Sequence, residues 1–246
     1  MQFYTLISDD IKKAKSSCIA LLGGGGKTAL LHKLADEFAM YYSAVLQTSL
    51  TKTAFHKSEK PLILSEYNIE NLEALKFDRN PLFIIGEKIN SEKLKGISES
   101  ELDIIKHLFD ITIFECDGAR NLPLKVHTEH DPIVPEFATH VVIIVGADVV
   151  NTRISDGLVH RPELFCKMWN VKPDFQLDND FIVKVLTSKK GYLSKVPKEV
   201  EIVYFVNKWD GNQVNAEALA IALYRETGKP TYYGSIQKNV LDQVKL

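Results

Sequence analysis

Between Ile19 and Leu31 the chain reads Ile-Ala-Leu-Leu-Gly-Gly-Gly-Gly-Lys-Thr-Ala-Leu-Leu. An apolar run precedes the glycines and leucines recur at helical spacing after them, which predicts a buried strand, a glycine turn and an amphipathic helix in direct succession. Consecutive glycines let the backbone turn sharply and direct several N–H groups toward one point, with no Cβ to block an anion. The stretch therefore has the layout of a phosphate-binding loop.

The loop contains groups suited to a triphosphate and its metal ion. Lys27 would place a positive charge between the terminal phosphates, and the Thr28 hydroxyl is placed to ligate Mg²⁺. The helix that follows would add the positive end of its dipole. The candidate nucleotide-binding residues of the loop are Gly23, Gly24, Gly25, Gly26, Lys27 and Thr28.

The loop departs from the common pattern G-x-x-x-x-G-K-[ST] at its first position, where Leu21 replaces the glycine. Either the loop is two residues shorter than usual, or the strand runs further and Gly23 takes the role of the first glycine. A flexible glycine turn with an incidental lysine is the alternative interpretation. The strand before the loop and the helix after it argue against that alternative.

Composition predicts one large α/β domain and argues against several other classes of protein. The 246 residues are 45% hydrophobic and carry a net charge of −2, so we expect a sizeable core and no affinity for a nucleic-acid backbone. We find no stretch long enough to span a bilayer and no basic-then-apolar leader, which predicts a cytoplasmic protein without a membrane partner. Three widely separated cysteines argue against a disulfide framework.

A second apolar strand ends in two carboxylates. Residues 111–118 read Ile-Thr-Ile-Phe-Glu-Cys-Asp-Gly, which places Glu115 and Asp117 at the end of the strand. Asp117 is the natural partner of Thr28 for Mg²⁺ in a phosphoryl-transfer site, a turn residue being the alternative. Glu115 is a candidate for orienting a water molecule. The candidate catalytic residues are therefore Lys27, Asp117 and Glu115, and the candidate metal ligands are Thr28 and Asp117.

Two other interpretations of this strand are open. Glu115 could instead form an ion pair with Arg120 or Lys125 at the edge of the core. Cys116 alternates to the side of the strand opposite both carboxylates, so we expect it in the core and not as a nucleophile.

A third strand, expected over 200–206, leads into Asn207-Lys208-Trp209-Asp210, the N-K-x-D pattern. The carboxylate of Asp210 can accept from the N1–H and the amine of guanine at once. Asn207 can meet the O6/N7 edge, and the stem of Lys208 can cover the ring or brace the loop. This chemistry favours GTP over ATP as the bound nucleotide.

Several polar residues are candidates for a second site near the first. Hydroxyls and a lysine at 48–53 follow a strand expected at 44–48, where they could sense a terminal phosphate or form an exposed loop. A metal site at 127–131 is disfavoured because turn and surface roles are commoner in so proline-rich a loop. The second-site candidates are Lys52, Arg120, His160 and Arg161.

Strands that alternate with helices predict a three-layer P-loop NTPase fold, with a mainly parallel sheet flanked by helices. Further strands are expected at 141–145 and 231–234. Helices are expected after the capping box of Ser98 and Glu101, after Asp178, and up to Gly228. We assign residues 1–246 to a single domain with an irregular insertion at about 54–97, which contains a helix expected near 69–75.

Taken together, these segments resemble the selenium-dependent hydroxylase accessory protein family, often called YqeC-like. Cys116 and Asp131 depart from the family pattern, which more usually has a small residue and a glutamate there. The resemblance rests on the segments 23–28, 48–53, 115–125, 130–135, 159–161, 191–193 and 207–210. It implies a P-loop NTPase that assists the maturation of selenium-dependent molybdenum hydroxylases by handling selenium or the molybdenum cofactor. The implied partners are such a hydroxylase or another cofactor maturation protein.

The functional expectation is a Mg²⁺-dependent nucleoside triphosphatase that favours GTP over ATP. One alternative is a P-loop kinase or transferase whose small acceptor binds between the 120–135 loop and the pair His160-Arg161. Another is a nucleotide-dependent chaperone that does not hydrolyse its nucleotide and uses it to change its grip on a partner enzyme.

Overall fold

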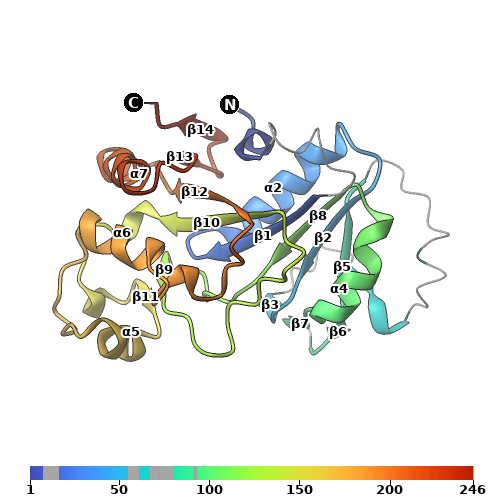
Figure 1. Cartoon of the computed structure of the whole chain (residues 1–246), viewed down its shortest axis with the longest axis horizontal. Coiled ribbons are helices and arrows are strands. Elements are labelled where there is room, and N and C mark those ends of the chain that lie inside the picture. The colour runs from blue at the N-terminus through green and yellow to red at the C-terminus, as the bar shows by residue number, and fades with distance from the viewer. Residues whose placement is uncertain (8–16, 55–60, 67–71, 73–79, 91–92, 246) are drawn as a thin grey trace.

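The structure, a computed structural model, describes residues 1–7, 17–54, 61–66, 72, 80–90 and 93–245. Its centre is a nine-stranded sheet with the order β14-β13-β12-β10-β1-β8-β2-β5-β4 (Figure 1). Neighbouring strands run parallel, except that β14 is antiparallel to β13. The bounds are β1 (Ser17–Gly23), β2 (Val45–Ser49), β4 (Leu62–Ile63), β5 (Leu82–Ile85), β8 (Ile111–Glu115), β10 (His140–Gly146), β12 (Glu201–Asn207), β13 (Thr231–Ser235) and β14 (Val240–Gln243).

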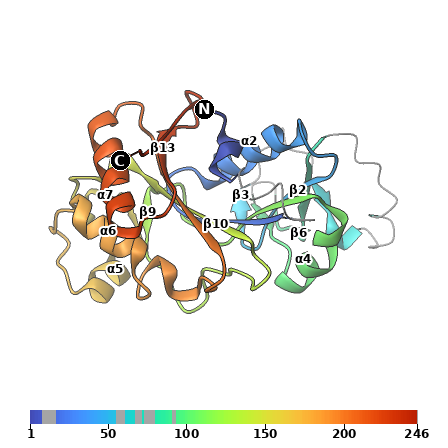
Figure 2. The ribbon, with the colours of Figure 1, turned by 45° about the horizontal axis from the view of Figure 1, so that its top comes forward.

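Helices cover both faces of the sheet, which confirms the predicted three-layer α/β fold (Figures 1 and 2). The first 3-10 helix and α2 pack on one face, and α4, α5, α6 and α7 contribute to the core on the other. The α-helices are α2 (Lys27–Ala39), α4 (Glu99–Ile105), α5 (Pro162–Trp169), α6 (Asn179–Thr187) and α7 (Gln213–Thr227). The 3-10 helices are η1 (Phe3–Leu6), η2 (Leu64–Glu66), η3 (Lys106–Leu108), η4 (Ala147–Val149), η5 (Ile154–Asp156) and η6 (Tyr192–Lys195).

Strand β1 shows why its sequence is apolar throughout. Ile19 and Leu21 belong to the core under α2, whereas Ala20 and Leu22 belong to the core on the opposite face. Side chains of a strand alternate between faces, so a strand covered by helices on both sides has no solvent-facing position. The same alternation explains the continuous apolar run of β10, whose seven residues are all buried.

The helix boundaries follow the predicted signals. Ser98 and Glu101 form the capping box at the start of α4. The Asp178 side chain accepts a hydrogen bond from Phe181 N at 2.8 Å and so caps α6. Helix α7 ends at Gly228, which has the left-handed φ of +62° that glycine adopts without strain.

The stretch from 54 to 97 contributes short strands. Strands β5 and β4 extend the main sheet beyond β2, and the apolar runs that include Leu62 and Leu82 form them. A separate antiparallel sheet is built from β3 (Thr53–Ala54), β7 (Lys93–Lys95) and β6 (Glu87–Lys88). Apart from Leu72, the helix expected near 69–75 lies outside the described residues.

Parallel pairing brings the chain segments of interest to one edge of the sheet. Leu21 in β1 pairs with Glu115 in β8, and Gly23 pairs with Ile144 in β10. Gly146 at the end of β10 pairs with Asn207 at the end of β12. The glycine loop, the carboxylates after β8 and the N-K-x-D segment therefore meet at the carboxyl ends of adjacent strands, where open α/β sheets bind ligands.

A two-stranded parallel ladder stands beside this edge. It is formed by β9 (Leu124–Lys125) and β11 (Val159–His160), in which His160 pairs with Lys125. This ladder holds the segments around 120–131 and 159–161 together, although some 30 residues separate them in the chain. In the part of the chain that the structure describes, no helix is long and apolar enough to cross a bilayer.

Candidate functional site

The glycine loop is compact because strand β1 continues to Gly23. Three glycines, at positions 24–26, then connect β1 to α2. Gly25 and Gly26 have φ values of +80° and +132°, and a Cβ on either would lie 2.4 Å from Gly146 N or from Asn207 Nδ2 respectively. Both the backbone conformation and the space therefore require glycine here. Of the two interpretations of the missing first glycine, the structure matches the extended strand.

The start of α2 presents a row of N–H groups. Gly24 N donates to Ile144 O at 3.0 Å and Gly25 N donates to Leu122 O at 2.9 Å, so protein carbonyls take these two donors. Within the described residues no protein acceptor takes the next four N–H groups, of residues 26–29, and Leu30 N makes the first helical bond. A helix N-terminus with untaken N–H groups is suited to bind an anion.

Asp117, which is completely buried, is the electrostatic centre of the site. Its carboxylate accepts from Gly23 N at 3.0 Å and lies 3.2 Å from Lys27 Nζ. It also lies 3.3 Å from Lys125 Nζ and accepts from His127 Nε2 at 2.7 Å. Burial acts to raise the pKa of Asp117, but Lys27, the His127 hydrogen bond and Lys125 hold it well below its usual range. The carboxylate is therefore ionised and fully engaged by protein groups.

Glu115 is the carboxylate that meets the Thr28 hydroxyl. Thr28 Oγ1 donates to Glu115 Oε1 at 2.5 Å. Asp117 makes no described contact with Thr28, and its partners are the loop amide, two lysines and a histidine. The expectation that Thr28 and Asp117 hold Mg²⁺ together stays a prediction. Burial raises the pKa of Glu115, and Lys27 and the Thr28 hydrogen bond lower it only in part. Neither of the alternative ion pairs, with Arg120 or with Lys125, forms among the described contacts.

Hard oxygen donors at Thr28 and Glu115 fit a magnesium ion held jointly with substrate phosphates. Mg²⁺ is usually bound through one or two protein oxygens, phosphate oxygens and water, not by a protein cage. The described residues contain no cluster of three or more histidine, cysteine, aspartate or glutamate side chains that could hold a metal ion unaided. Cys116, buried in the core on the other side of the sheet, confirms the expectation that it is not part of this site.

Asn207 ties the N-K-x-D segment to the glycine loop. Its side chain, in a residue only 6% exposed, donates from Nδ2 to Gly25 O at 2.7 Å. Its Oδ1 accepts from Ile236 N at 3.1 Å, which brings in the loop after β13. The amide thus joins three loops that follow three different strands.

Lys208 and Asp210 flank this anchor differently. Lys208 has a left-handed φ of +64° and places its ammonium 2.6 Å from Asp148 Oδ2, an arrangement that braces the loop. Asp210 is half-buried, and its carboxylate has no protein partner among the described residues. The carboxylate is therefore available to a ligand.

The second-site candidates separate into two groups. Arg161 Nη1 donates to Asp131 Oδ1 at 3.0 Å, and His160 lies beside it in the β9–β11 ladder. Arg120 is exposed at a turn with a φ of +48°. Lys52 is exposed in the segment between β2 and β3, and no described contact joins it to Arg120, His160 or Arg161.

The hydroxyls before Lys52 are taken by nearby backbone. Thr48 Oγ1 donates to Ile84 O at 2.6 Å, and Ser49 Oγ accepts from Thr51 N at 3.1 Å. Thr48 therefore joins β2 to β5, and Ser49 stabilises the turn after β2.

Several residues of the site were missed in the sequence because they act from separate segments. Tyr192 is buried, accepts from Lys125 N at 3.1 Å and packs its ring edge-on against His127. A Cβ on Gly23 would lie 3.0 Å from the Tyr192 ring. Asp148 holds Lys208 from the turn after β10. In the sequence, only the segment 191–193 of the family resemblance pointed to any of these residues, and it indicated no role for Tyr192.

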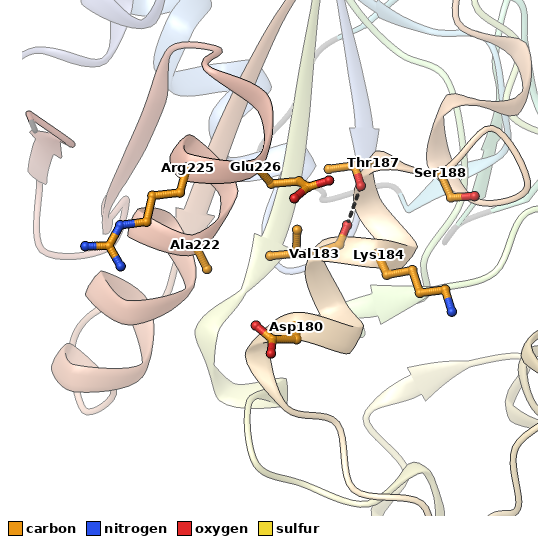
Figure 3. A pocket seen from close by; sticks show the side chains of 8 residues that line it. All are labelled: Asp180, Val183, Lys184, Thr187, Ser188, Ala222, Arg225 and Glu226. Carbon is orange, nitrogen blue, oxygen red and sulfur yellow. Dashed lines mark hydrogen bonds between the residues drawn. The ribbon is translucent and has the colours of Figure 1, made fainter.

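Surface hollows lie elsewhere. One of about 490 Å³ opens between α6 and α7, where Thr187 Oγ1 donates to Val183 O (Figure 3). Its charged lining residues have both signs, and none comes from the glycine loop: Asp180, Lys184, Arg225 and Glu226. None of the loop N–H groups at the start of α2 opens into this hollow.

Comparison with known proteins identifies related chains. The model of a family described as YqeC protein matches residues 19–163, more than half of the chain. The chain is also similar to a protein of Escherichia coli (strain K12) named "Uncharacterized protein YqeC". The two are 25% identical over 238 residues, which cover 95% of this chain and 93% of that relative. The family match includes the glycine loop, both carboxylates of β8 and the pair His160-Arg161.

Replacing Lys125 with methionine is expected to destabilise the protein by about 3–5 kcal/mol. Lys125 is fully buried, 2.5 Å from Asp131 and 3.3 Å from Asp117, so its loss leaves buried carboxylates without a main counter-charge. Urea unfolding measures the change. The matched control is Lys95→Met, which breaks an exposed ion pair with Glu87 and should cost under about 1 kcal/mol. Equal losses in the two variants would contradict the role given to Lys125.

Proposed function

The chain belongs to the YqeC protein family, and we propose that it is a Mg²⁺-dependent nucleoside triphosphatase that prefers GTP to ATP. One observation carries the proposal: Asn207 is hydrogen-bonded to the glycine loop, and the N–H groups of residues 26–29 have no acceptor among the described residues. A base-reading segment and an anion-binding helix start are thereby held next to each other. That arrangement supports a ligand that has both a purine and a phosphate chain.

The loop and Lys27 would hold the phosphates. The N–H groups at the start of α2 would donate to phosphate oxygens, and Lys27 would exchange its present partners, Gly23 O and Asp117, for the terminal phosphates. Asp117 retains Lys125 and His127 after that exchange. The exchange therefore leaves no buried charge without a partner.

Thr28 and Glu115 would hold the magnesium ion, which when bound neutralises charge that develops on the transferred phosphoryl group. Glu115 supports this proposal because its buried carboxylate forms no ion pair within the described chain, and burial raises its pKa more than Lys27 and the Thr28 hydrogen bond lower it. Its second oxygen, Oε2, has no partner among the described contacts and is placed to orient a water. Asp117 would act as the fixed charge that positions Lys27.

The base would contact Asp210 and Asn207. Asp210 is half-buried and has no protein partner in the described chain, as expected of a group that accepts hydrogen bonds from a guanine edge. Asn207 is already fixed by Gly25 O and Ile236 N, so little conformational entropy would be lost on binding.

Family membership supports an accessory role in the maturation of selenium-dependent molybdenum hydroxylases. In this proposal the partner is such a hydroxylase or a cofactor maturation protein, and nucleotide state changes how tightly the chain holds it. A pull-down whose yield depends on the nucleotide would support that use of the site.

A phosphoryl transferase is the second candidate function. It is favoured by a continuous series of ion pairs that runs from Lys27 through Asp117, Lys125 and Asp131 to Arg161, because it places a second polar cluster beside the phosphate loop. Product analysis distinguishes the two functions. Hydrolysis yields free phosphate, whereas transfer yields a phosphorylated acceptor.

Replacing Lys27 with alanine is expected to weaken Mg²⁺–GTP binding by about tenfold to a hundredfold, because one charged hydrogen-bond donor to phosphate is worth about 1.5–3 kcal/mol. Calorimetric titration with GTP and ATP measures the affinities. Lys33→Ala, at a half-buried position later in the same helix where Lys33 pairs with Glu37, is the matched control and should leave affinity unchanged. Unchanged affinity and turnover in the Lys27 variant would refute the phosphate-loop assignment.

Replacing Glu115 with glutamine tests the proposed magnesium ligands. The variant should keep the hydrogen bond from Thr28 but lose the negative charge, so the gain in nucleotide affinity on adding Mg²⁺ should fall by roughly tenfold. Titrations with and without Mg²⁺ measure that gain. Should Asp117→Asn remove the gain while Glu115→Gln keeps it, the original assignment to Asp117 would be the correct one.

Replacing Asp210 with asparagine is expected to lower GTP affinity by roughly tenfold and to leave ATP affinity unchanged. The reason is that the N1–H and the amine of guanine would lose their carboxylate acceptor. Competition between the two nucleotides gives the ratio directly. The control is Asp242→Asn, at an exposed position in β14. Equal affinities of the unmodified protein for GTP and ATP would already exclude a guanine preference.

A further inference from the structure

A cluster of cationic side chains surrounds His160 beside the β9–β11 ladder, which lies near α5 in Figure 1. Lys125 is the ladder partner of His160, and Arg161 follows it directly in the chain. Arg120 lies at the turn before β9. Together with Asp131, these are the charged groups whose fields act on the His160 ring.

The ring of His160 is buried, and its Nδ1 has no hydrogen-bond partner in the described chain. The residue is 8% exposed, and Nδ1 has no solvent contact. Burial first, and then the charges of Arg161, Lys125 and Arg120, lower the pKa of His160 to about 4. The ring is therefore neutral at pH 7, with one nitrogen able to donate and one able to accept.

The negative charge in the cluster, that of Asp131, is already engaged by protein groups. Asp131 Oδ1 accepts from Thr128 N at 2.7 Å and from Thr128 Oγ1 at 2.6 Å, and Oδ2 lies 2.5 Å from Lys125 Nζ. Arg161 reaches Asp131 through Nη1 only, so the remaining donors of its guanidinium have no protein partner among the described residues. Arg120 has no carboxylate partner in that part of the chain. The cluster thus has excess positive charge and untaken donors.

We propose that Arg120, His160 and Arg161 bind a phosphate-type oxyanion at a site separate from the glycine loop. Two guanidinium groups and an imidazole match a doubly charged tetrahedral group better than a singly charged carboxylate, because each guanidinium can donate twice. The anion would also supply the counter-charge that the cluster lacks. The same chemistry applies to free phosphate and to a phosphate carried by a small molecule.

The site is linked to the glycine loop but does not need it. Lys125 contacts both Asp131 and Asp117, so the two sites share a buried ammonium. Binding at the proposed site uses none of the N–H groups at the start of α2. The inference therefore stands whether or not the chain hydrolyses a nucleotide.

Inorganic phosphate is the probe, and the ring resonances of His160 report its binding. These are followed by NMR across pH in the unmodified protein and in Lys27→Ala, and assigned with His160→Gln. Bound phosphate should raise the pKa of His160 from about 4, because the anion favours the imidazolium. Binding would then take up a proton at His160, but phosphate itself gains a proton and loses charge over the same pH range, so the readout is the His160 pKa and not the pH dependence of affinity.

Arg120→Gln should weaken phosphate binding by about tenfold or more, because the guanidinium contributes at least one charged hydrogen bond. Lys167→Gln, an exposed change of equal charge on α5, is the matched control and should leave binding unchanged. The melting temperature verifies that both variants fold. Acetate at equal ionic strength should bind more weakly than phosphate, and a phosphate monoester added in a parallel arm distinguishes a carried phosphate from a free one.

A His160 pKa that phosphate leaves unchanged would overturn the proposal. So would phosphate binding that disappears in Lys27→Ala without having affected His160, because that binding would belong to the glycine loop. Acetate as effective as phosphate would refute the selectivity. Loss of nucleotide binding with an intact His160 response would instead count against the nucleotide proposal alone.

Discussion

The carboxylate of Asp117, sealed from solvent at the end of β8, is the constraint on which the site depends. A buried negative charge is costly unless it is compensated, and here the compensation comes from Lys27, Lys125 and His127. These partners lie on α2, on β9 and on the loop after it. Satisfying one charge thus fixes the glycine loop, the β9–β11 ladder and the turn between them relative to the sheet.

Sequence reasoning reached the features that are local in the chain. The strand, glycine turn and helix around Gly23, the capping signals and the N-K-x-D segment are contiguous patterns, and parallel topology then places them at one edge. The pairing of Thr28 with Glu115 was not predicted, because alternation puts Glu115 and Asp117 on the same side of β8 and does not say which reaches Thr28. Strand register decides it, and register is a property of the folded sheet.

Contacts between residues far apart in the chain could not be predicted from the sequence, because they too depend on how the segments meet in the folded protein. Lys125 is charged, so composition suggests an exposed position, yet it is fully buried between two aspartates. His127 and Tyr192 meet across about 65 residues of chain to support the glycine loop. The family match covers residues 19–163, so the interpretation of the N-K-x-D segment beyond it rests on the geometry of Asn207.

The hydrogen bond from Asn207 to the carbonyl of Gly25 has a consequence for how a bound nucleotide would be sensed. Both groups belong to the polypeptide itself, so the N-K-x-D segment would keep its place whether the proposed nucleotide were a diphosphate or a triphosphate. Any difference in binding between a diphosphate and a triphosphate would then originate at the phosphate end of the nucleotide. There Lys27 contacts both Gly23 O and Asp117. The protein would thus hold the nucleotide through fixed contacts at the base, and through contacts at the terminal phosphate that change with the nucleotide state.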